Sequence, residues 1–387
     1  MFYLTSSSVQ AEELSFFFKD TYEDSRAQFL KNAESLKTQV PNLQLRSLKI
    51  PSAKSEELFT DVLYVPPPDA DKDRLLILVS GIHGMEGFVG SALQNMFLQK
   101  NFFEARNQGF GVLLVHALNP YGFKFHRRVS ENNIDLNRNF DINNSLFELK
   151  NDGYQSVRDL LNPTDSVGSG TLDRVKFYIQ CVVAIAKYSM DSLRRAILKG
   201  QYEVPEGIYF GGNKFEPQKD LLEKELLEFS NGYKKILLID LHTGYGQRGK
   251  LHLFADRSPA LDASYLEKIF AGQGLDYGQK KNFYEATGGL VVYAAKLFQN
   301  KARYAGMVFE FGTLDSQKTL GSLDSLYRMV RENQHTHHGA HSPQDAQQIQ
   351  HLFSEMFYPQ DSQWRIDSAH QFEKALASAL QKQKELK

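Results

Sequence analysis

The sequence predicts an α/β fold in which a central mixed, mostly parallel sheet is flanked by helices. Two observations lead to this prediction. Short unbroken apolar runs recur along the chain and are typical of strands buried on both faces. Amphipathic segments alternate with them, as in proteins whose helices cover a sheet. Because 42% of the 387 residues are hydrophobic and 24% are charged, an ordinary globular balance, we expect one α/β domain over residues 1–387.

The strands are predicted from runs of apolar residues. In chain order, they are Leu43–Ile50, Glu57–Val65, Arg74–Ser80, Gly111–Ala117, Lys235–Asp240, Leu251–Ala255 and Ala305–Phe311. In sheets of this class, loops converge at the carboxyl ends of the strands. We therefore expect the polar residues of a functional site to lie at those ends.

Helices are predicted where apolar residues recur at helical spacing. The clearest is Pro217–Ser230, in which leucines share one face while lysines and glutamates cover the other. Another begins at Ala92–Gln99. We also expect an N-terminal helical segment at about 9–38, a helical insertion at about 141–215 and a C-terminal helical segment at about 343–387. The polar segment Gln334–His341, which holds four histidines, is predicted to be a solvated surface loop rather than a metal site.

Charge and cysteine content exclude several classes of protein. The 45 basic and 46 acidic residues leave a net charge of −1, which predicts no nucleic-acid partner. The single cysteine, Cys181, lies in an apolar run and excludes an intramolecular disulfide framework. The N-terminus lacks the pattern of a signal peptide, and no run of 18 apolar residues occurs. We therefore expect a cytoplasmic protein without a membrane partner, and no feature predicts an oligomeric state.

A His-x-x-Glu pair follows the predicted strand Arg74–Ser80. His83 and Glu86 lie in a glycine-rich loop, where neither a buried strand nor a tight turn requires an imidazole and a carboxylate. Zinc binds neutral imidazole nitrogen and carboxylate oxygen. The alternative is a surface turn that carries these two residues by chance, and further ligands are needed to favour a metal site.

A second histidine follows another buried strand. The run Lys235–Asp240 leads directly into His242, so the carboxyl ends of two predicted strands each carry an imidazole. Two histidines and one glutamate form the ligand set of a catalytic zinc site. If the strand continues, Asp240 points to the same side as His242 and orients the imidazole of His242 without binding the metal itself. The alternative role for Asp240 is to cap the strand end.

The polar segment between these ligands carries a recognisable motif. The block Asp135–Phe140, with His83 and Glu86 before it and His242 after it, resembles the zinc carboxypeptidase family, and within it a little-characterised bacterial branch of metallopeptidases. The stretch Tyr284–Gly289 is similar to the family's Tyr-x-Ala-Ser-Gly-Gly motif, and Phe309–Gly312 occupies the place of its catalytic glutamate. The resemblance implies a zinc carboxypeptidase-like fold, also called phosphorylase/hydrolase-like.

The resemblance implies the following catalytic roles. Zinc is held by His83, Glu86 and His242. Glu310 acts as the general base that takes a proton from the attacking water and passes it to the leaving amine. Arg128 stabilises the oxyanion, and it is preferred to Arg127 because it stands nine residues before Asn137.

The resemblance also implies how substrate is bound. Asn137 and Arg138 bind the terminal carboxylate of the substrate. Tyr284 closes over the substrate, with movement allowed by the glycines that follow it. Val291 falls where the family sets the character of the side-chain pocket, and an apolar residue there favours an apolar or neutral terminal residue.

The resulting expectation is a zinc-dependent hydrolase that cleaves an amide bond next to a free carboxylate with metal-activated water. A carboxypeptidase-like metallopeptidase acting on peptides is the first reading. An N-acyl amino acid deacylase or a cell-wall peptide amidase with the same zinc site is the alternative enzyme, and the insertion at about 141–215 leaves room for a restricted pocket suited to acylated amino acids. A non-catalytic, metal-stabilised binding protein is the third reading, although the retained Glu310 argues against it. One metal ion or two are both compatible with the pattern.

Overall fold

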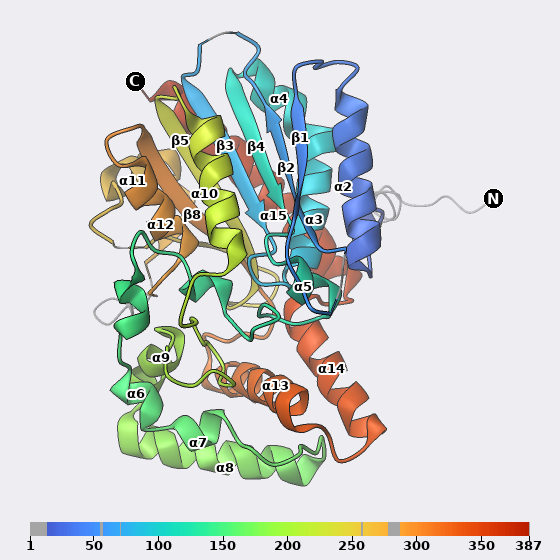
Figure 1. Cartoon of the computed structure of the whole chain (residues 1–387), viewed down its shortest axis with the longest axis vertical. Coiled ribbons are helices and arrows are strands. Elements are labelled where there is room, and N and C mark those ends of the chain that lie inside the picture. The colour runs from blue at the N-terminus through green and yellow to red at the C-terminus, as the bar shows by residue number, and fades with distance from the viewer. Residues whose placement is uncertain (1–13, 55–56, 70, 257, 278–286, 387) are drawn as a thin grey trace, which may run out of the picture.

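The computed structural model describes residues 14–54, 57–69, 71–256, 258–277 and 287–386. Within these residues, eight strands form one sheet in the order β1-β2-β4-β3-β5-β8-β6-β7 (Figure 1). The neighbours β4, β3, β5 and β8 run parallel, whereas β2 is antiparallel to β4 and β6 is antiparallel to β8. Helices flank this sheet. The predicted α/β class with a mixed, mostly parallel sheet is confirmed.

Seven of the eight strands lie close to their predicted positions, and the two-residue strand Leu275–Asp276 was not predicted. Their bounds are β1 Gln44–Lys49, β2 Phe59–Val65, β3 Arg74–Ser80, β4 Phe110–His116, β5 Lys235–Gly244, β6 Leu251–Phe254, β7 Leu275–Asp276 and β8 Arg303–Gly312. The largest difference is in β5, which extends four residues beyond the predicted end at Asp240 because its pairing with β8 continues to Gly244. His242 therefore lies inside a strand rather than after one.

The helices surround the sheet and form an additional layer at one end of it. Their bounds are α2 Tyr22–Leu36, α3 Gly87–Met96, α4 Phe102–Asn107, α5 Pro120–Lys124, α6 Asp152–Gln155, α7 Arg158–Leu161, α8 Thr171–Tyr188, α9 Met190–Leu198, α10 Pro217–Ser230, α11 Ala263–Ile269, α12 Leu290–Phe298, α13 Thr319–His338, α14 Pro343–Phe357 and α15 Ser362–Glu385. A π-helix at Phe97–Asn101 joins α3 to α4. None of the helices in the described part of the chain is long and apolar enough to cross a membrane.

Alternate residues of the strands enter two separate cores, one on each face of the sheet. In β3, Leu76 and Leu78 pack with α2, α3 and α15, while Leu75 and Ile77 pack with α10 and α12. This alternation follows from the two-residue period of a strand. Because both faces are covered, an unbroken apolar run is the sequence pattern of such a strand.

A third core lies apart from the sheet. Residues of α6–α9, which belong to the predicted helical insertion, pack against α13, and Figure 1 shows these helices below the sheet. The prediction of a surface loop at Gln334–His341 is wrong for most of that segment, because α13 continues to His338. Its end is set by Gly339, whose φ of +77° ends the helix, rather than by the polar composition of the segment.

The buried His116 of β4 predicts how stability changes with pH. Its ring stacks on Phe29, its Nε2 lies 2.8 Å from the Ser91 hydroxyl, and burial lowers its pKa from 6.5 to about 4. The folded state disfavours the charged imidazole. The buried neutral ring therefore stabilises the fold fully above pH 6.5, the ordinary pKa of histidine, and this stabilisation is lost as the pH falls towards 4. We expect His116→Gln to reduce the difference in unfolding free energy between pH 7 and pH 4 by up to about 3 kcal/mol. Urea unfolding of both proteins at a series of pH values tests this, and parallel pH profiles would contradict it.

Candidate metal centre

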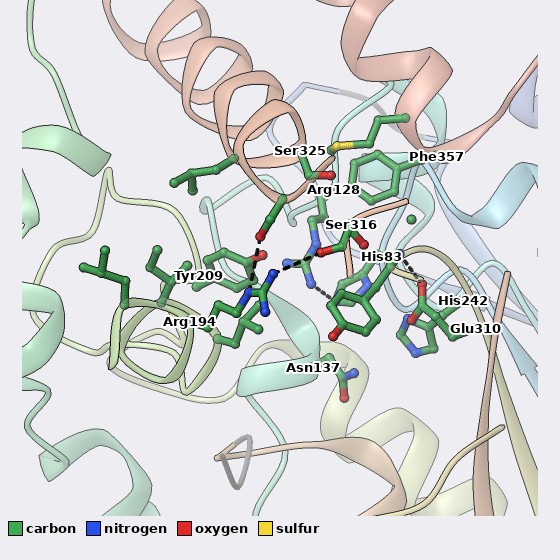
Figure 2. Close-up of a pocket in the computed structure, with 18 of the residues that line it drawn as sticks. His83, Arg128, Asn137, Arg194, Tyr209, His242, Glu310, Ser316, Ser325 and Phe357 are labelled. Carbon is green, nitrogen blue, oxygen red and sulfur yellow. Dashed lines mark hydrogen bonds between the residues drawn. The ribbon is translucent and has the colours of Figure 1, made fainter. Parts of the chain in front are cut away.

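A cavity of about 300 Å³ lies between the sheet and the layer of helices α6–α9 and α13. One end of it is polar and is lined by residues at the carboxyl ends of β3, β5 and β8, including His83, His242 and Glu310 (Figure 2). The other end is apolar and is lined by side chains of α7, α8, α9 and α13, such as Leu161 and Leu193. The predicted insertion therefore closes one side of the space next to the candidate ligands.

The backbone brings the three predicted ligands together. Ser80 at the end of β3 pairs with Leu241 of β5, so the loop after β3 lies beside His242. The loop turns sharply at Gly84, where a side-chain carbon would lie 2.0 Å from the backbone of Gly122. His83 and Glu86 flank this glycine, and Glu86 directly precedes α3. One ligand atom from each of His83, Glu86 and His242 lies within 4.8 Å of the other two.

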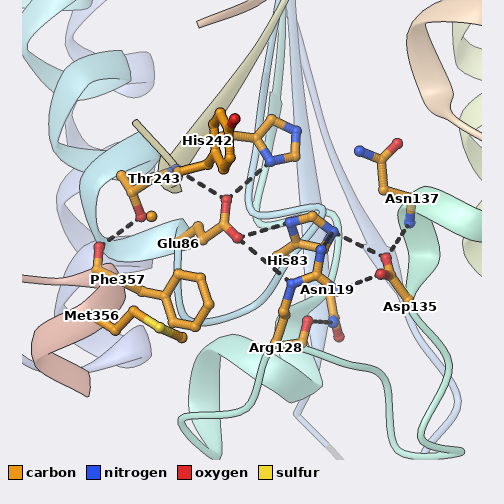
Figure 3. A network of polar contacts seen from close by, with 12 residues as sticks. His83, Glu86, Asn119, Arg128, Asp135, Asn137, His242, Thr243, Met356 and Phe357 are labelled. Carbon is orange, nitrogen blue, oxygen red and sulfur yellow. Dashed lines mark hydrogen bonds and ion pairs between the residues drawn. The ribbon is translucent and has the colours of Figure 1, made fainter. Parts of the chain in front are cut away.

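The carboxylate of Glu86 lies between the two imidazoles (Figure 3). Its Oε1 is 2.8 Å from Nδ1 of His83, and its Oε2 is 2.9 Å from Nδ1 of His242. All three side chains are buried, with exposed fractions of 3% each. Nδ1 of His83 thus faces a carboxylate oxygen at short distance, although the angles do not make a hydrogen bond. A divalent metal fits this donor set, because two imidazole nitrogens and a carboxylate oxygen, which are ligand types that zinc prefers, converge on one point.

Two aspartates contact the outer nitrogens of the candidate ligand histidines. Nε2 of His83 lies 3.0 Å from Asp135, and Nε2 of His242 lies 2.8 Å from Asp240. A metal-binding histidine is normally oriented in this way, with its second nitrogen donating to a carboxylate. Asp240 reaches His242 because both side chains lie on the same face of the extended β5. Asp135 was quoted in the sequence motif without a role, and its position two residues before Asn137 was the only signal for it.

Substitution of Asp240 tests this arrangement. We expect Asp240→Asn to weaken zinc binding by about 10–100-fold, because the neutral amide no longer polarises and orients the imidazole of His242. Competition with a chromogenic chelator measures the affinity. Asp367→Asn serves as the control, since Asp367 is only half-buried on α15 and does not line the cavity. Equal zinc affinities for Asp240→Asn and the wild type would show that the contact has no effect on the metal.

The charges of the buried cluster depend strongly on one another. Burial by itself would raise the pKa of Glu86, but His83 and His242 hold that pKa well below its usual range. Burial likewise disfavours the charged form of His242, but Asp240 and Glu86 raise its pKa well above the usual value. Without metal, the cluster therefore holds an imidazolium between two carboxylates. A metal ion would replace that proton with its own positive charge.

Glu310 lies beside this cluster. The parallel register of β5 and β8 pairs it directly with His242. Its Oε1 accepts a hydrogen bond of 2.9 Å from the backbone N–H of Tyr245, and its side chain lines the cavity. Burial and the nearby charge of Glu86 raise its pKa to about 8. A carboxylate with a raised pKa next to a metal centre has the properties of a general base.

The structure places Arg128 and Arg127 in different surroundings. The Arg128 guanidinium donates to Asp135, its Nη2 lies 2.7 Å from Nε2 of His83, and it lines the cavity. Arg127 instead pairs with Glu332 of α13 at 2.7 Å. Of the two arginines, only Arg128 lies at the candidate metal centre. Its guanidinium also lies over the ring of Tyr209, another residue that lines the cavity.

The predicted substrate-binding residues have different positions. Asn137 and Arg138 both line the cavity, but both terminal nitrogens of Arg138 donate to backbone carbonyls, at 2.7 Å to Asn137 and 2.7 Å to Leu198. The prediction that Val291 lines the side-chain pocket needs correction, because its side chain lies in the core between α12 and β8, next to Gly306. The reason is its position on the face of α12 that packs on the sheet. Tyr284 lies outside the described residues.

Several solved structures are similar to the chain in fold. Bovine thrombin-activatable fibrinolysis inhibitor, solved with tick carboxypeptidase inhibitor, is 13% identical over 82% of this chain and 97% of its own, with a TM-score of 0.45. Carboxypeptidase A from Helicoverpa armigera is 14% identical over 88% and 74%, with a TM-score of 0.45. Murein-tripeptide amidase from Escherichia coli O157 is 15% identical over 75% and 92%, with a TM-score of 0.35. These similarities concern the fold alone.

At the level of sequence, the chain matches one family of proteins. No curated protein matches it. A match to the family DUF2817, described as a protein of unknown function, extends over residues 18–371. Since this match covers most of the sequence, the chain belongs to the DUF2817 family.

Proposed function

We propose that the protein is a zinc-dependent hydrolase that cleaves an amide bond next to a free carboxylate. One observation carries the proposal: the ligand cluster of His83, Glu86 and His242 lies at a cavity, directly beside the buried carboxylate of Glu310. A structural metal site is closed by protein ligands, whereas a catalytic site has three protein ligands and an open position. Three ligands facing a cavity correspond to the catalytic kind.

Zinc, when bound, supplies a Lewis acid that polarises a carbonyl and lowers the pKa of water to about 7. Glu310 then accepts a proton from the attacking water and returns it to the leaving nitrogen. Its hydrogen bond from the Tyr245 N–H fixes one carboxylate oxygen and leaves the other for this proton. The raised pKa of Glu310 makes its protonated form a competent acid for the second step.

Arg128 is the residue proposed to stabilise the developing oxyanion. It is buried, it lines the cavity, and its pKa is raised by Asp135 despite burial, so its guanidinium stays charged. Asp135 also fixes the guanidinium next to His83. A cation held in advance at the place where negative charge forms needs little reorganisation during the reaction.

The shape of the cavity favours small substrates with an apolar group. Its far end is lined by aliphatic side chains of the insertion, for example Leu161 and Ile197. Such an end would receive the side chain of a terminal residue, and it would equally receive an acyl chain. A deacylase of N-acyl amino acids is therefore the second candidate.

Hydrolysis assays of the zinc-loaded protein test the proposal. A panel of dipeptides and N-acyl amino acids with apolar residues is incubated with the protein, and release of free amine is measured. Cleavage of peptides supports the carboxypeptidase-like activity, and cleavage of acyl amino acids alone supports the deacylase. Zinc binding without cleavage of any member of the panel would favour a metal-stabilised binding protein.

A further inference from the structure

Arg194 of α9 lines the same cavity as the candidate metal centre. It belongs to the predicted insertion rather than to any motif that carried the family resemblance. Figure 2 shows its guanidinium among the cavity residues, on the side of Ser316. The insertion therefore contributes a permanent positive charge to the same space as Glu310 and His242.

The contacts of Arg194 are weak in comparison with those of the other cavity arginines. Its Nη2 lies 3.5 Å from the carbonyl of Ser316 and 3.4 Å from that of Gln317. Its Nε lies 3.4 Å from the hydroxyl of Ser322. These distances exceed the usual range for N–H···O bonds. In the part of the chain that the structure describes, no carboxylate lies within ion-pairing distance of this guanidinium.

The other two arginines of the cavity are already engaged. Arg128 donates to Asp135, and Arg138 uses both terminal nitrogens for backbone carbonyls at 2.7 Å. A bidentate bond from Arg138 to a substrate carboxylate would require these two bonds to break. The guanidinium of Arg194 has no comparable contacts to lose, so it is the arginine whose donors are most available to an anion.

The apolar surroundings of Arg194 make it energetically unfavourable to leave the charge of its guanidinium unpaired. Leu193 and Ile197 of the same helix, together with Leu326 of α13, line the adjoining part of the cavity. Tyr245 also faces this space: burial raises the pKa of its hydroxyl, and the positive charge of Arg194 opposes the rise. A partly buried cation beside apolar walls gains much from an anionic partner, since water compensates it poorly there.

We propose that Arg194 binds the free carboxylate of the substrate, while the apolar end of the cavity receives the apolar group next to that carboxylate. This inference rests on the proposed hydrolase function and assigns its carboxylate specificity to the insertion instead of to Arg138. The preferred substrates are thus amides of amino acids with aliphatic or aromatic side chains and a free carboxylate.

Paired substrates test the role of Arg194 in hydrolysis. The substrates are an N-blocked dipeptide that ends in leucine and the same peptide with its terminal carboxylate converted to an amide. We expect Arg194→Met to lower kcat/KM for the free acid by about 10–100-fold and to leave the amide nearly unchanged. Arg194→Lys, which keeps the charge, restores part of this preference. Arg195→Met is the matched control, because Arg195 is the next residue of α9 and does not line the cavity.

A binding measurement separates this inference from the proposed function. Calorimetry of the zinc-free protein with N-acetyl-leucine and with N-acetyl-leucinamide reports carboxylate recognition without any reaction. Tighter binding of the acid, lost in Arg194→Met but kept in Arg195→Met, supports the inference even if the wild type hydrolyses nothing. The inference is overturned if Arg194→Met keeps the acid preference, if only Arg138→Met removes it, or if the wild type binds neither compound. Matching circular dichroism spectra exclude misfolding of the variants.

Discussion

Purified wild-type protein is expected to contain about one equivalent of zinc, and His242→Ala almost none. The reason is geometric. Glu86 lies between the two imidazoles, and removal of His242 leaves two ligands in a site that needs at least three protein donors. Elemental analysis after exhaustive dialysis measures the metal content. In the wild type, zinc should also raise the midpoint of thermal unfolding, since a ligand that binds only the folded state stabilises it.

The histidines of α13 provide the control for this experiment. His338→Ala removes an imidazole from the histidine-rich end of that helix and leaves the buried cluster intact. We expect it to keep about one equivalent of zinc, as the wild type does. The opposite pattern, with zinc kept in His242→Ala and lost in His338→Ala, would place the metal at the end of α13 and would remove the basis for the proposed active site.

The pH dependence of zinc binding gives a second measure of the same site. Asp240 and Glu86 raise the pKa of His242 well above its usual value, so the metal-free protein holds a proton that zinc must displace. Zinc affinity should therefore rise as the pH rises, with protons released on binding. Titration in two buffers of different ionisation enthalpy detects this release.

The elements that were predicted well are those whose sequence pattern is local. The bounds of β3 and α10 agree with the prediction, because an unbroken apolar run and a clear amphipathic pattern each have one simple structural interpretation. The extension of β5 to Gly244 was missed, since it depends on pairing with β8, about 70 residues away. The two-residue strand β7 is too short to produce a pattern of its own.

The candidate ligands were predictable for a topological reason. His83 follows the buried strand β3 and His242 lies near the carboxyl end of β5, and parallel strands place their carboxyl ends at the same edge of a sheet. The positions of Val291 and Arg194 were not predictable in the same way. Val291 lies on the sheet-facing side of α12, and Arg194 reaches the cavity because α9 packs with α13 in the layer of helices at the end of the sheet. Both depend on how helices pack in three dimensions, which local spacing does not encode.

Glu310→Gln is expected to lower kcat by about 10²–10⁴-fold while the protein keeps its zinc. Glutamine has the size of glutamate and can still accept the hydrogen bond from the Tyr245 N–H, so the local structure should persist. It cannot accept a proton from water at neutral pH. A loss of activity without a loss of metal therefore separates the role of Glu310 as a base from a role in metal binding. Glu216→Gln is the control, because Glu216 is also buried with a raised pKa but does not line the cavity.

The pH dependence of folding stability provides a second test of Glu310. Burial and Glu86 raise the pKa of Glu310 to about 8, far above its ordinary value, so the metal-free folded state favours the protonated carboxyl. The protonated Glu310 carboxyl therefore stabilises the fold fully below 4.5, the pKa of glutamate in the unfolded chain. This stabilisation is lost as the pH rises towards 8. Metal-free Glu310→Gln should therefore be more stable than the wild type at pH 8 and should lack this pH dependence. An inactive variant that is also more stable would indicate that the buried carboxylate is kept for its chemistry, at the expense of the stability of the fold. Activity close to that of the wild type in Glu310→Gln would instead exclude Glu310 as the general base.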